Sequence, residues 1–380
     1  MPLRKQEFNV VRDDLTKAID VDDSQGRSVP TNMNFVEEGY LIKDTGYIPV
    51  GLSTATLDHS IFTYEKKDGT IYLIKGKDTK LQRYSFIDRA WYDIENSPTF
   101  TAEAEFGYVV YDDNLYLGNA VESLYKFDGT TFTAYPSAPK GNILEIFEDR
   151  LFISGVLAEP LTIYYTDAAT VTVFPPTNVL KPLGADKVQA LTNYYGTLLI
   201  FKKNSIWKLT FVYDQVVALF LPKLEVQSNN YGAASRKTVG WVENDIWFFT
   251  GREVRSIGYK DQQIGILGVN NSVISDAIKE SLKLISVTNW DKCSSFYHQR
   301  RYYLSVPLTS DYNDVTYVCH LLYGNNWTKY LGRDKARFRS STIYNEVIYT
   351  TNNYIPYGVI KWTVEEEDSQ DLNLYLTTES

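Results

Sequence analysis

The sequence predicts an all-β fold, and three features support this prediction: its aromatic content, the alternation of its apolar residues, and a repeated unit. The 380 residues include 30 Tyr, 18 Phe and 7 Trp. Aromatic side chains fit the pleated, half-buried surface of a sheet. Hydrophobic residues make up 44% of the chain, which is enough for a substantial core.

The repeated unit is clearest at residues 112–135, DDNLYLGNAVESLYKFDGTTFTAY, where three short apolar strands are separated by polar turns. The third strand follows a turn at Asp128-Gly129. Six further copies occur along the chain. The first apolar residues of the seven units lie roughly 36 to 56 residues apart, and they are Ile71, Leu115, Leu151, Leu198, Ile246, Tyr302 and Val347. A four-stranded propeller blade has about 40–50 residues.

Most units are preceded by another short apolar strand, for example SIFTYE, FGYVVY and NILEIF, so each repeat has four strands. One blade cannot bury both of its faces, whereas radial stacking covers them. We therefore predict a single β-propeller of about seven four-stranded blades. Six or eight blades stay open, because the N-terminal segment could supply a strand to the last blade. An open β-sandwich or two smaller β domains is the alternative, which the even spacing disfavours.

One stretch predicts a helix. In ISDAIKESLKLI, residues 274–285, apolar residues recur at helical spacing, and Ser275 is placed to cap the start. We expect a short helix on the rim of the ring, between the fifth and sixth units. Residues 1–30 are polar and are predicted to form an N-terminal arm, with the propeller domain at 31–380.

The arm supplies the only interface residues that the sequence predicts. They are apolar, lie beside charged residues, and are Phe8, Val10 and Val11. We expect them to order on a neighbouring subunit.

Charge and cysteine content exclude several classes of function. The formal net charge is −9, which disfavours binding to DNA phosphates or to an anionic membrane surface through basic patches. Only Cys293 and Cys319 are present, so the fold is not a disulfide scaffold and suits a reducing compartment. No apolar run approaches the roughly 20 residues of a transmembrane helix, and no secretory signal is visible, so we expect a soluble protein made in the cytosol.

Two groups of residues resemble metal sites. Cys293, His298, Cys319 and His320 fall in one repeat, but they lack the paired spacing of structural zinc ligands, which favours cysteines in a β core. The segment DVDDSQG, residues 20–26, resembles a calcium loop. Positions six and twelve of that loop hold Gln25 and Thr31 instead of Gly and Glu, which favours a solvated acidic turn.

The sequence shows no motif for catalysis. Sialidase-type turns, a G-x-S-x-G elbow and phosphate-binding glycine patterns are missing, and 47 acidic residues offer too many carboxylate pairs to single one out. We therefore predict a protein that is not an enzyme, with no catalytic, cofactor-binding or metal-ligating residues. Five tryptophans fall in predicted strands, where core packing is favoured, and they are Trp207, Trp241, Trp247, Trp327 and Trp362.

The order of motifs along the chain carries a resemblance. It begins with VPTNMNFVEEGYLIKDTGYIPVG at 29–51, continues through GNILEIFEDRLFISG, GTLLIFKKNSIWKL and KTVGWVENDIWFF, and ends with VCHLLYGNNWTKYL. This layout resembles β-propeller virion proteins of tailed bacteriophages, above all the tail nozzle or tail hub proteins of short-tailed phages, including packaged-DNA-stabilisation proteins. The matching residues of the first motif are Asn32, Met33, Gly39, Tyr40 and Leu41. The resemblance covers most of residues 29–365. Nozzle proteins are often longer, and the N-terminal arm has no match.

The resemblance implies a structural role in the virion tail, with assembly in the host cytoplasm. We expect copies to form a homo-oligomeric ring, six-fold in symmetry, that attaches to the portal-adaptor and lines or closes the DNA exit channel. Genomic DNA would pass without specific binding, and acidic walls would help it to slide. A glycan- or receptor-binding propeller is the alternative, and a glycoside hydrolase is less favoured.

Overall fold

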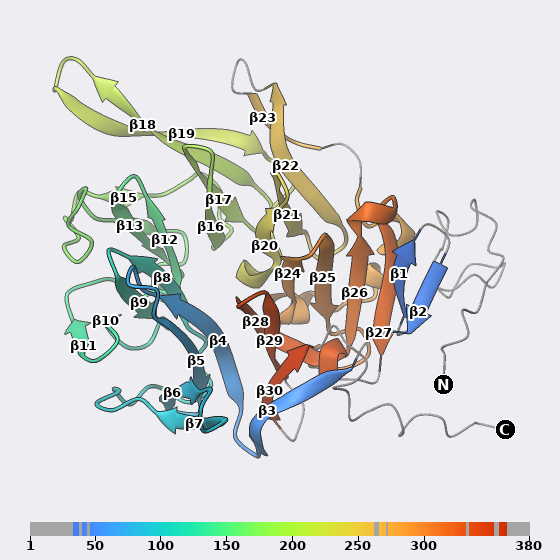
Figure 1. Cartoon of the computed structure of the whole chain (residues 1–380). Coiled ribbons are helices and arrows are strands. Elements are labelled where there is room, and N and C mark those ends of the chain that lie inside the picture. The colour runs from blue at the N-terminus through green and yellow to red at the C-terminus, as the bar shows by residue number, and fades with distance from the viewer. Residues whose placement is uncertain are drawn as a thin grey trace, which may run out of the picture.

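The computed structural model describes residues 33–37, 40–43, 46–261, 266–270, 273–331, 334–352 and 357–362. Seven four-stranded antiparallel sheets are arranged around an axis (Figure 1). The predicted all-β propeller with seven blades is therefore confirmed. In six of the seven blades the four strands are consecutive in the chain and pair in that order, which is why the sequence repeats one unit for each sheet.

The first three blades follow one another directly along the chain. Blade 1 contains β4 (Asp58–Glu65), β5 (Ile71–Lys77), β6 (Lys80–Ser85) and β7 (Ala90–Asp93). Blade 2 contains β8 (Gly107–Tyr111), β9 (Asn114–Gly118), β10 (Leu124–Phe127) and β11 (Phe132–Tyr135). Blade 3 contains β12 (Ile143–Phe147), β13 (Arg150–Ser154), β14 (Ile163–Tyr165) and β15 (Val179–Leu180).

The next three blades have the same order. Blade 4 contains β16 (Val188–Tyr194), β17 (Thr197–Lys202), β18 (Ile206–Asp214) and β19 (Leu219–Ser228). Blade 5 contains β20 (Val239–Val242), β21 (Asp245–Phe249), β22 (Val254–Asp261) and β23 (Ile266–Val269). Blade 6 contains β24 (Ser294–His298), β25 (Arg301–Val306), β26 (Val315–His320) and β27 (Asn326–Leu331).

The seventh blade joins the two ends of the ring. It contains β28 (Phe338–Tyr344), β29 (Val347–Asn352), β30 (Tyr357–Trp362) and, from the N-terminal side, β3 (Tyr47–Thr54). Strand β3 pairs antiparallel with β30, with Tyr47 opposite Trp362. The N-terminal segment therefore does supply a strand to the last blade, which settles the number of blades at seven. Strands β1 (Met33–Glu37) and β2 (Tyr40–Lys43) form a separate two-stranded sheet.

The seven residues predicted to begin the repeats all lie in the second strand of a blade. Leu115, Leu151, Leu198 and Ile246 are fully buried. In β17 all six residues are buried, because this strand is covered on both faces by neighbouring blades. The core is thus a series of apolar seams between adjacent blades rather than one central mass.

The predicted helix is present but shorter than expected. A 3-10 turn (Asp276–Ile278) leads into α2 (Lys279–Lys283), and Ile278 and Leu282 are buried in the seam between blades 5 and 6. The capping role predicted for Ser275 is wrong: its hydroxyl accepts a hydrogen bond from Val254 N at 2.8 Å instead of capping the turn. The remaining 3-10 turns are Arg236–Thr238, Val287–Lys292, Leu321–Tyr323 and Asp334–Arg337. Among the described residues, no helix is long and apolar enough to span a membrane.

Candidate functional site: an axial cavity and a projecting hairpin

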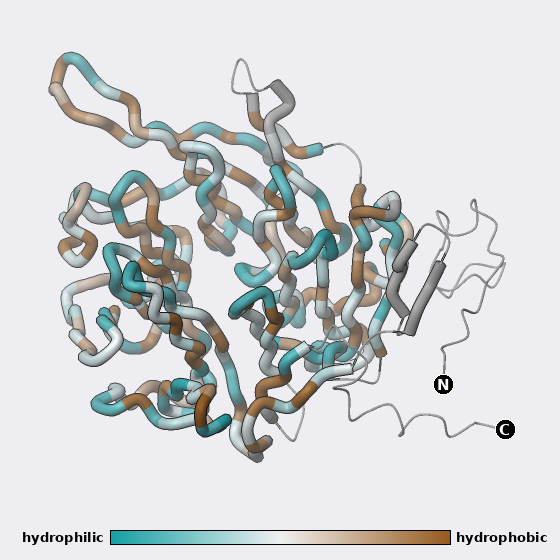
Figure 2. Tube along the Cα trace, in the orientation of Figure 1, coloured by the Kyte–Doolittle hydropathy of each residue, from teal (hydrophilic) through white to brown (hydrophobic). Residues whose placement is uncertain are grey.

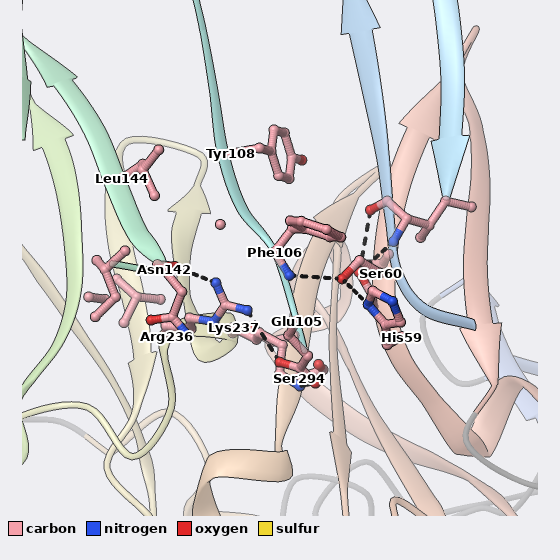
Figure 3. Close-up of a pocket in the computed structure, with 18 of the residues that line it drawn as sticks. His59, Ser60, Glu105, Phe106, Tyr108, Asn142, Leu144, Arg236, Lys237 and Ser294 are labelled. Atoms are coloured by element: carbon pink, nitrogen blue, oxygen red, sulfur yellow. Dashed lines mark hydrogen bonds and ion pairs between the residues drawn. The ribbon is translucent and has the colours of Figure 1, made fainter. Parts of the chain in front are cut away.

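A cavity of about 300 Å³ lies on the propeller axis (Figure 3). Its walls come from the first strand of every blade or from the three residues before that strand. The polar residues among its lining include His59, Ser60, Glu105, Asn142, Arg236, Lys237, Ser294 and Ser341. Because the seven first strands converge on the axis, every repeat contributes residues to this cavity.

Small residues allow the first strands to approach the axis. Gly107 shows the constraint most clearly, because a Cβ at this position would lie 2.1 Å from the carbonyl oxygen of Asn142 in the next blade. Ser60 lies at the equivalent point of blade 1, and its hydroxyl accepts a hydrogen bond from Phe106 N at 3.1 Å. These contacts hold neighbouring first strands together and leave the cavity open between them.

Glu105 is the centre of an ion-pair cluster in this cavity. Its Oε1 atom lies 2.6 Å from Arg339 Nε and 2.9 Å from Lys237 Nζ, and its Oε2 atom lies 3.3 Å from Arg236 Nη2. Arg236 also donates a 2.6 Å hydrogen bond to the carbonyl oxygen of Asn142. All four charged side chains are between 16% and 23% exposed. Three cations therefore share one carboxylate.

The ionisation of this cluster follows from burial and from the neighbouring charges. Burial raises the pKa of Glu105, but the charges of Lys237, Arg339 and Arg236 outweigh it and hold the pKa well below its usual range. Burial lowers the pKa of Lys237, and Glu105 opposes that effect. Burial, together with the charge of Arg339, lowers the pKa of His59 to about 4, so this imidazole is neutral at pH 7.

A second cavity of about 260 Å³ adjoins the first and shares Glu105, Asn142, Ile143 and Arg236 with it. It extends to Leu157, in the loop after β13, which is 75% exposed. The axial cluster is therefore reached from the face of the propeller on which the first strands begin.

A hairpin formed by β18 and β19 projects from blade 4 beyond the rest of the ring (Figure 1). The strands pair as far as Asp214 opposite Leu219, and Asp214 Oδ1 accepts a 2.8 Å hydrogen bond from Val216 N in the turn. Most residues near the tip are apolar, apart from polar residues at the turn (Figure 2). Val216 is 93% exposed and Phe220 is 60% exposed. We call residues 211–221 the arm tip. A two-stranded hairpin with apolar side chains in water is marginal by itself, so this segment is suited to contact a partner.

The residues predicted as an interface, Phe8, Val10 and Val11, lie outside the described residues, as does the acidic segment 20–26. The residues weighed as zinc ligands do lie in one blade. Cys293 and Cys319 are fully buried in an apolar cluster, and burial raises the pKa of the Cys293 thiol to about 12. Such protonated thiols are poor metal ligands. Within the described part of the chain, no group of three or more His, Cys, Asp or Glu residues is arranged to hold a metal ion.

Three of the five tryptophans confirm the predicted core packing, since Trp247, Trp327 and Trp362 are buried. Trp207 is half-buried. For Trp241 the prediction is wrong: this side chain is 40% exposed and lies 5.2 Å from Tyr195, centroid to centroid, at the turn of the preceding blade. Alternation in β20 does not bury Trp241, because this short strand presents that side to solvent.

Sequence reasoning missed the axial cluster. A usable signal was nevertheless present, because Glu105, Arg236 and Arg339 each lie just before or at the start of the first strand of a repeat. Aligning the seven repeats on their first strands would have placed these charges at one end of the ring. The sequence alone gives no distance between them, since they are far apart in the chain.

The chain matches no protein-family model, and no curated protein matches it in sequence. Its fold is similar to that of virginiamycin B lyase from Staphylococcus aureus, with a TM-score of 0.52 and 8% identity over 83% of this chain and 98% of the lyase. It is also similar to the extracellular domain of the putative one component system BT4673 from B. thetaiotaomicron, with a TM-score of 0.53 and 10% identity over 83% of this chain and 40% of that one. At these identities the similarity shows the fold alone.

Proposed function

We propose that this chain is a structural protein of a tailed-phage virion, a subunit of the nozzle or hub ring at the end of the tail. The order of motifs that resembles this family carries the proposal. The quoted motifs fall on β1 to β3, blade 3, blade 4, blade 5 and blade 6, so the resembling segments contribute strands to five of the seven blades. In this role, copies form a six-fold ring that attaches to the portal-adaptor.

The β18–β19 hairpin supports a role in assembly. Both faces of its outer part are exposed, and apolar side chains lie on each, including Val212, Tyr213 and Leu219. A second exposed apolar patch lies where blade 1 meets blade 7, across the ring from blade 4. It contains Leu52, Ile87 and Phe86, whose ring stacks on Tyr344. When two different patches of identical copies contact each other, the copies form a closed ring if the rotation from one copy to the next divides a full turn evenly. The arm tip of one copy would pack on this patch of the next.

The DNA channel belongs to the space between copies. The axial cavity of a single chain holds about ten water molecules by volume, which is far too little for a DNA duplex. The expected acidic walls would therefore line the centre of the ring of copies and not the propeller axis, where Arg236, Lys237 and Arg339 lie.

A non-enzymatic role fits the chemistry of the axis. A glycoside hydrolase needs a carboxyl group that is protonated near neutral pH, whereas three cations keep Glu105 ionised. Burial raises the pKa of Glu145 to about 7, but this residue is not part of the lining of the axial cavity. The similar fold of a lyase does not argue otherwise, because propellers host many unrelated functions.

Native mass spectrometry of the purified full chain, alone and mixed with portal-adaptor complexes of the same phage, tests the assembly role. We expect a closed ring of six copies, or a ring that forms on the adaptor. A chain that stays monomeric and does not bind the adaptor would contradict the proposal.

One observation favours a second candidate, a glycan-binding propeller. Tyr195 and Trp241 form an exposed aromatic pair with an edge-to-face arrangement, and Tyr194 lies 5.2 Å from the Trp241 ring. Exposed aromatic rings can stack on sugars. Binding of the wild-type chain on a glycan array, and its loss in Trp241→Ala, would support this candidate, whereas an array without signal would remove it.

A further inference from the structure

We propose that the axial cavity binds a small oxyanion, a phosphate, sulfate or carboxylate group, held by Arg236 and Lys237 of its lining and by Arg339, which lies behind them against Glu105. This inference is independent of the virion role, because it rests only on the charges and dimensions of the cavity.

The first argument is the imbalance of charge. Among the described residues, Glu105 is the only carboxylate that lines the axial cavity, and it faces three cations. In the adjoining cavity, Lys187 and Asp291 carry opposite charges and leave the excess unchanged. The chain as a whole has a net charge of −9, so this positive excess is a local feature. Partly desolvated cations without counter-charges are costly, and a bound anion removes that cost.

The second argument is the number of unused donors. Two arginines stay charged at every pH that a protein tolerates. Arg339 uses only its Nε atom on Glu105, and Lys237 uses one of its three N–H groups. Among the described residues, the terminal nitrogens of Arg339 and the other two N–H groups of Lys237 meet no acceptor. Guanidinium groups match the planar edge of a carboxylate or phosphate with two parallel hydrogen bonds.

The third argument is size and access. A volume of about 300 Å³ holds one oxyanion and a few waters, and excludes a polymer. The adjoining cavity leads from Glu105 and Arg236 toward the exposed Leu157. A free ion, or the anionic end of a slender molecule, can enter by this route.

The test is calorimetric titration of the full chain with inorganic phosphate, sulfate and acetate, together with thermal unfolding in each salt against sodium chloride of equal ionic strength. We expect one site per chain and a melting temperature that rises with the oxyanion concentration beyond the effect of chloride. Methyl phosphate distinguishes the source of the ligand. Binding equal to that of phosphate means that the site accepts a phosphate group carried on a larger molecule, and weaker binding means that it takes the free ion.

Variants give the sign of the effect. Arg339→Gln should weaken oxyanion binding at least tenfold, whereas Glu105→Gln should strengthen it, because removing the carboxylate leaves all three cations for the ligand. Lys80→Gln removes a positive charge from an exposed pair with Asp93 and should change nothing. If Arg339→Gln fails to fold, Glu105→Gln alone decides the question. No oxyanion effect beyond chloride in both the wild type and Glu105→Gln would overturn the proposal.

Discussion

Glu105 and Arg339 lie 234 residues apart in the chain, yet Arg339 Nε donates a 2.6 Å hydrogen bond to Glu105 Oε1 beside the propeller axis. The pair links the start of blade 2 to β28 of blade 7, on either side of blade 1. Both residues reach the axis because blade 7 packs against blade 1 and completes the ring.

Glu105→Gln should lower the free energy of unfolding by about 3 kcal/mol in chloride buffer, because it leaves three partly buried cations without a counter-charge. Urea denaturation at pH 7 measures this. The pKa of Glu105 is lower in the folded chain, so its contribution is fully present above the ordinary pKa of Glu and is lost as the pH falls below it. The variant should therefore lose less stability than the wild type on acidification to pH 3. An unchanged urea midpoint at pH 7 would contradict this view of the cluster.

The buried histidines should make stability fall between pH 6.5 and 4. Burial lowers the pKa of His59 to about 4 and that of His320 to about 3, so the unfolded chain binds protons in this range while the folded chain does not. Each imidazole should lower the free energy of unfolding by on the order of 2 kcal/mol between pH 7 and pH 4.5. Denaturant unfolding of His59→Gln at both pH values should show a smaller loss than the wild type, and an equal loss would show that His59 titrates normally in the fold.

Charge in the arm tip should abolish self-assembly without affecting the propeller. Val216→Asp with Phe220→Asp places two carboxylates on side chains that are exposed in the single chain. The melting temperature should stay close to that of the wild type, since exposed substitutions usually change stability by less than about 0.5 kcal/mol. Analytical ultracentrifugation should show loss of the ring. Leu183 is 77% exposed and lies outside the hairpin. Leu183→Asp is therefore the matched control, and this variant should still assemble.

Closure of the ring should depend on β3 and not on the first 28 residues. Val50 is buried against Val359 and Leu73, and its carbonyl accepts a 2.8 Å hydrogen bond from Trp91 Nε1. Val50→Ala should therefore lower the free energy of unfolding by about 2 kcal/mol, as measured by urea denaturation.

Deletion of residues 1–28 should leave the melting temperature unchanged, because all four strands of blade 7 lie outside that segment. If the deleted chain unfolds, closure involves more than β3.

The deletion also tests the predicted interface of Phe8, Val10 and Val11. We expect it to prevent assembly while the propeller stays folded. A deleted chain that still forms the ring would assign assembly to other surfaces, the arm tip first among them.

Six of the blades could be predicted from the sequence because each is local: four strands that are adjacent in the chain pair with one another, and their alternation marks the buried faces. The seventh blade is different, because it takes β3 from the N-terminal side. The turns between first and second strands were harder to identify by type. Asp112 and Asp113, like Glu148 and Asp149, both have positive φ, as in the turns that fit a tight hairpin. Such turns usually contain Gly or Asn, so the acidic pairs at these positions did not indicate the turn type.

The axial cluster and the projecting β18–β19 hairpin could not be predicted from the sequence, for different physical reasons. The cluster joins residues from three repeats, and only the closed ring brings Glu105, Arg236 and Arg339 together. The β18–β19 hairpin consists of alternating apolar residues, and from the sequence it cannot be distinguished from two buried strands. Only the paired length of β18 and β19 shows that they extend beyond the neighbouring blades.

Quantitative mass spectrometry of purified phage particles that encode this chain tests the central proposal most directly. The account predicts the chain in the particle at a copy number that is a small multiple of six, in fixed ratio to the portal-adaptor protein. Absence of the chain from the particles would contradict the virion role, and the search would turn to the glycan-binding candidate.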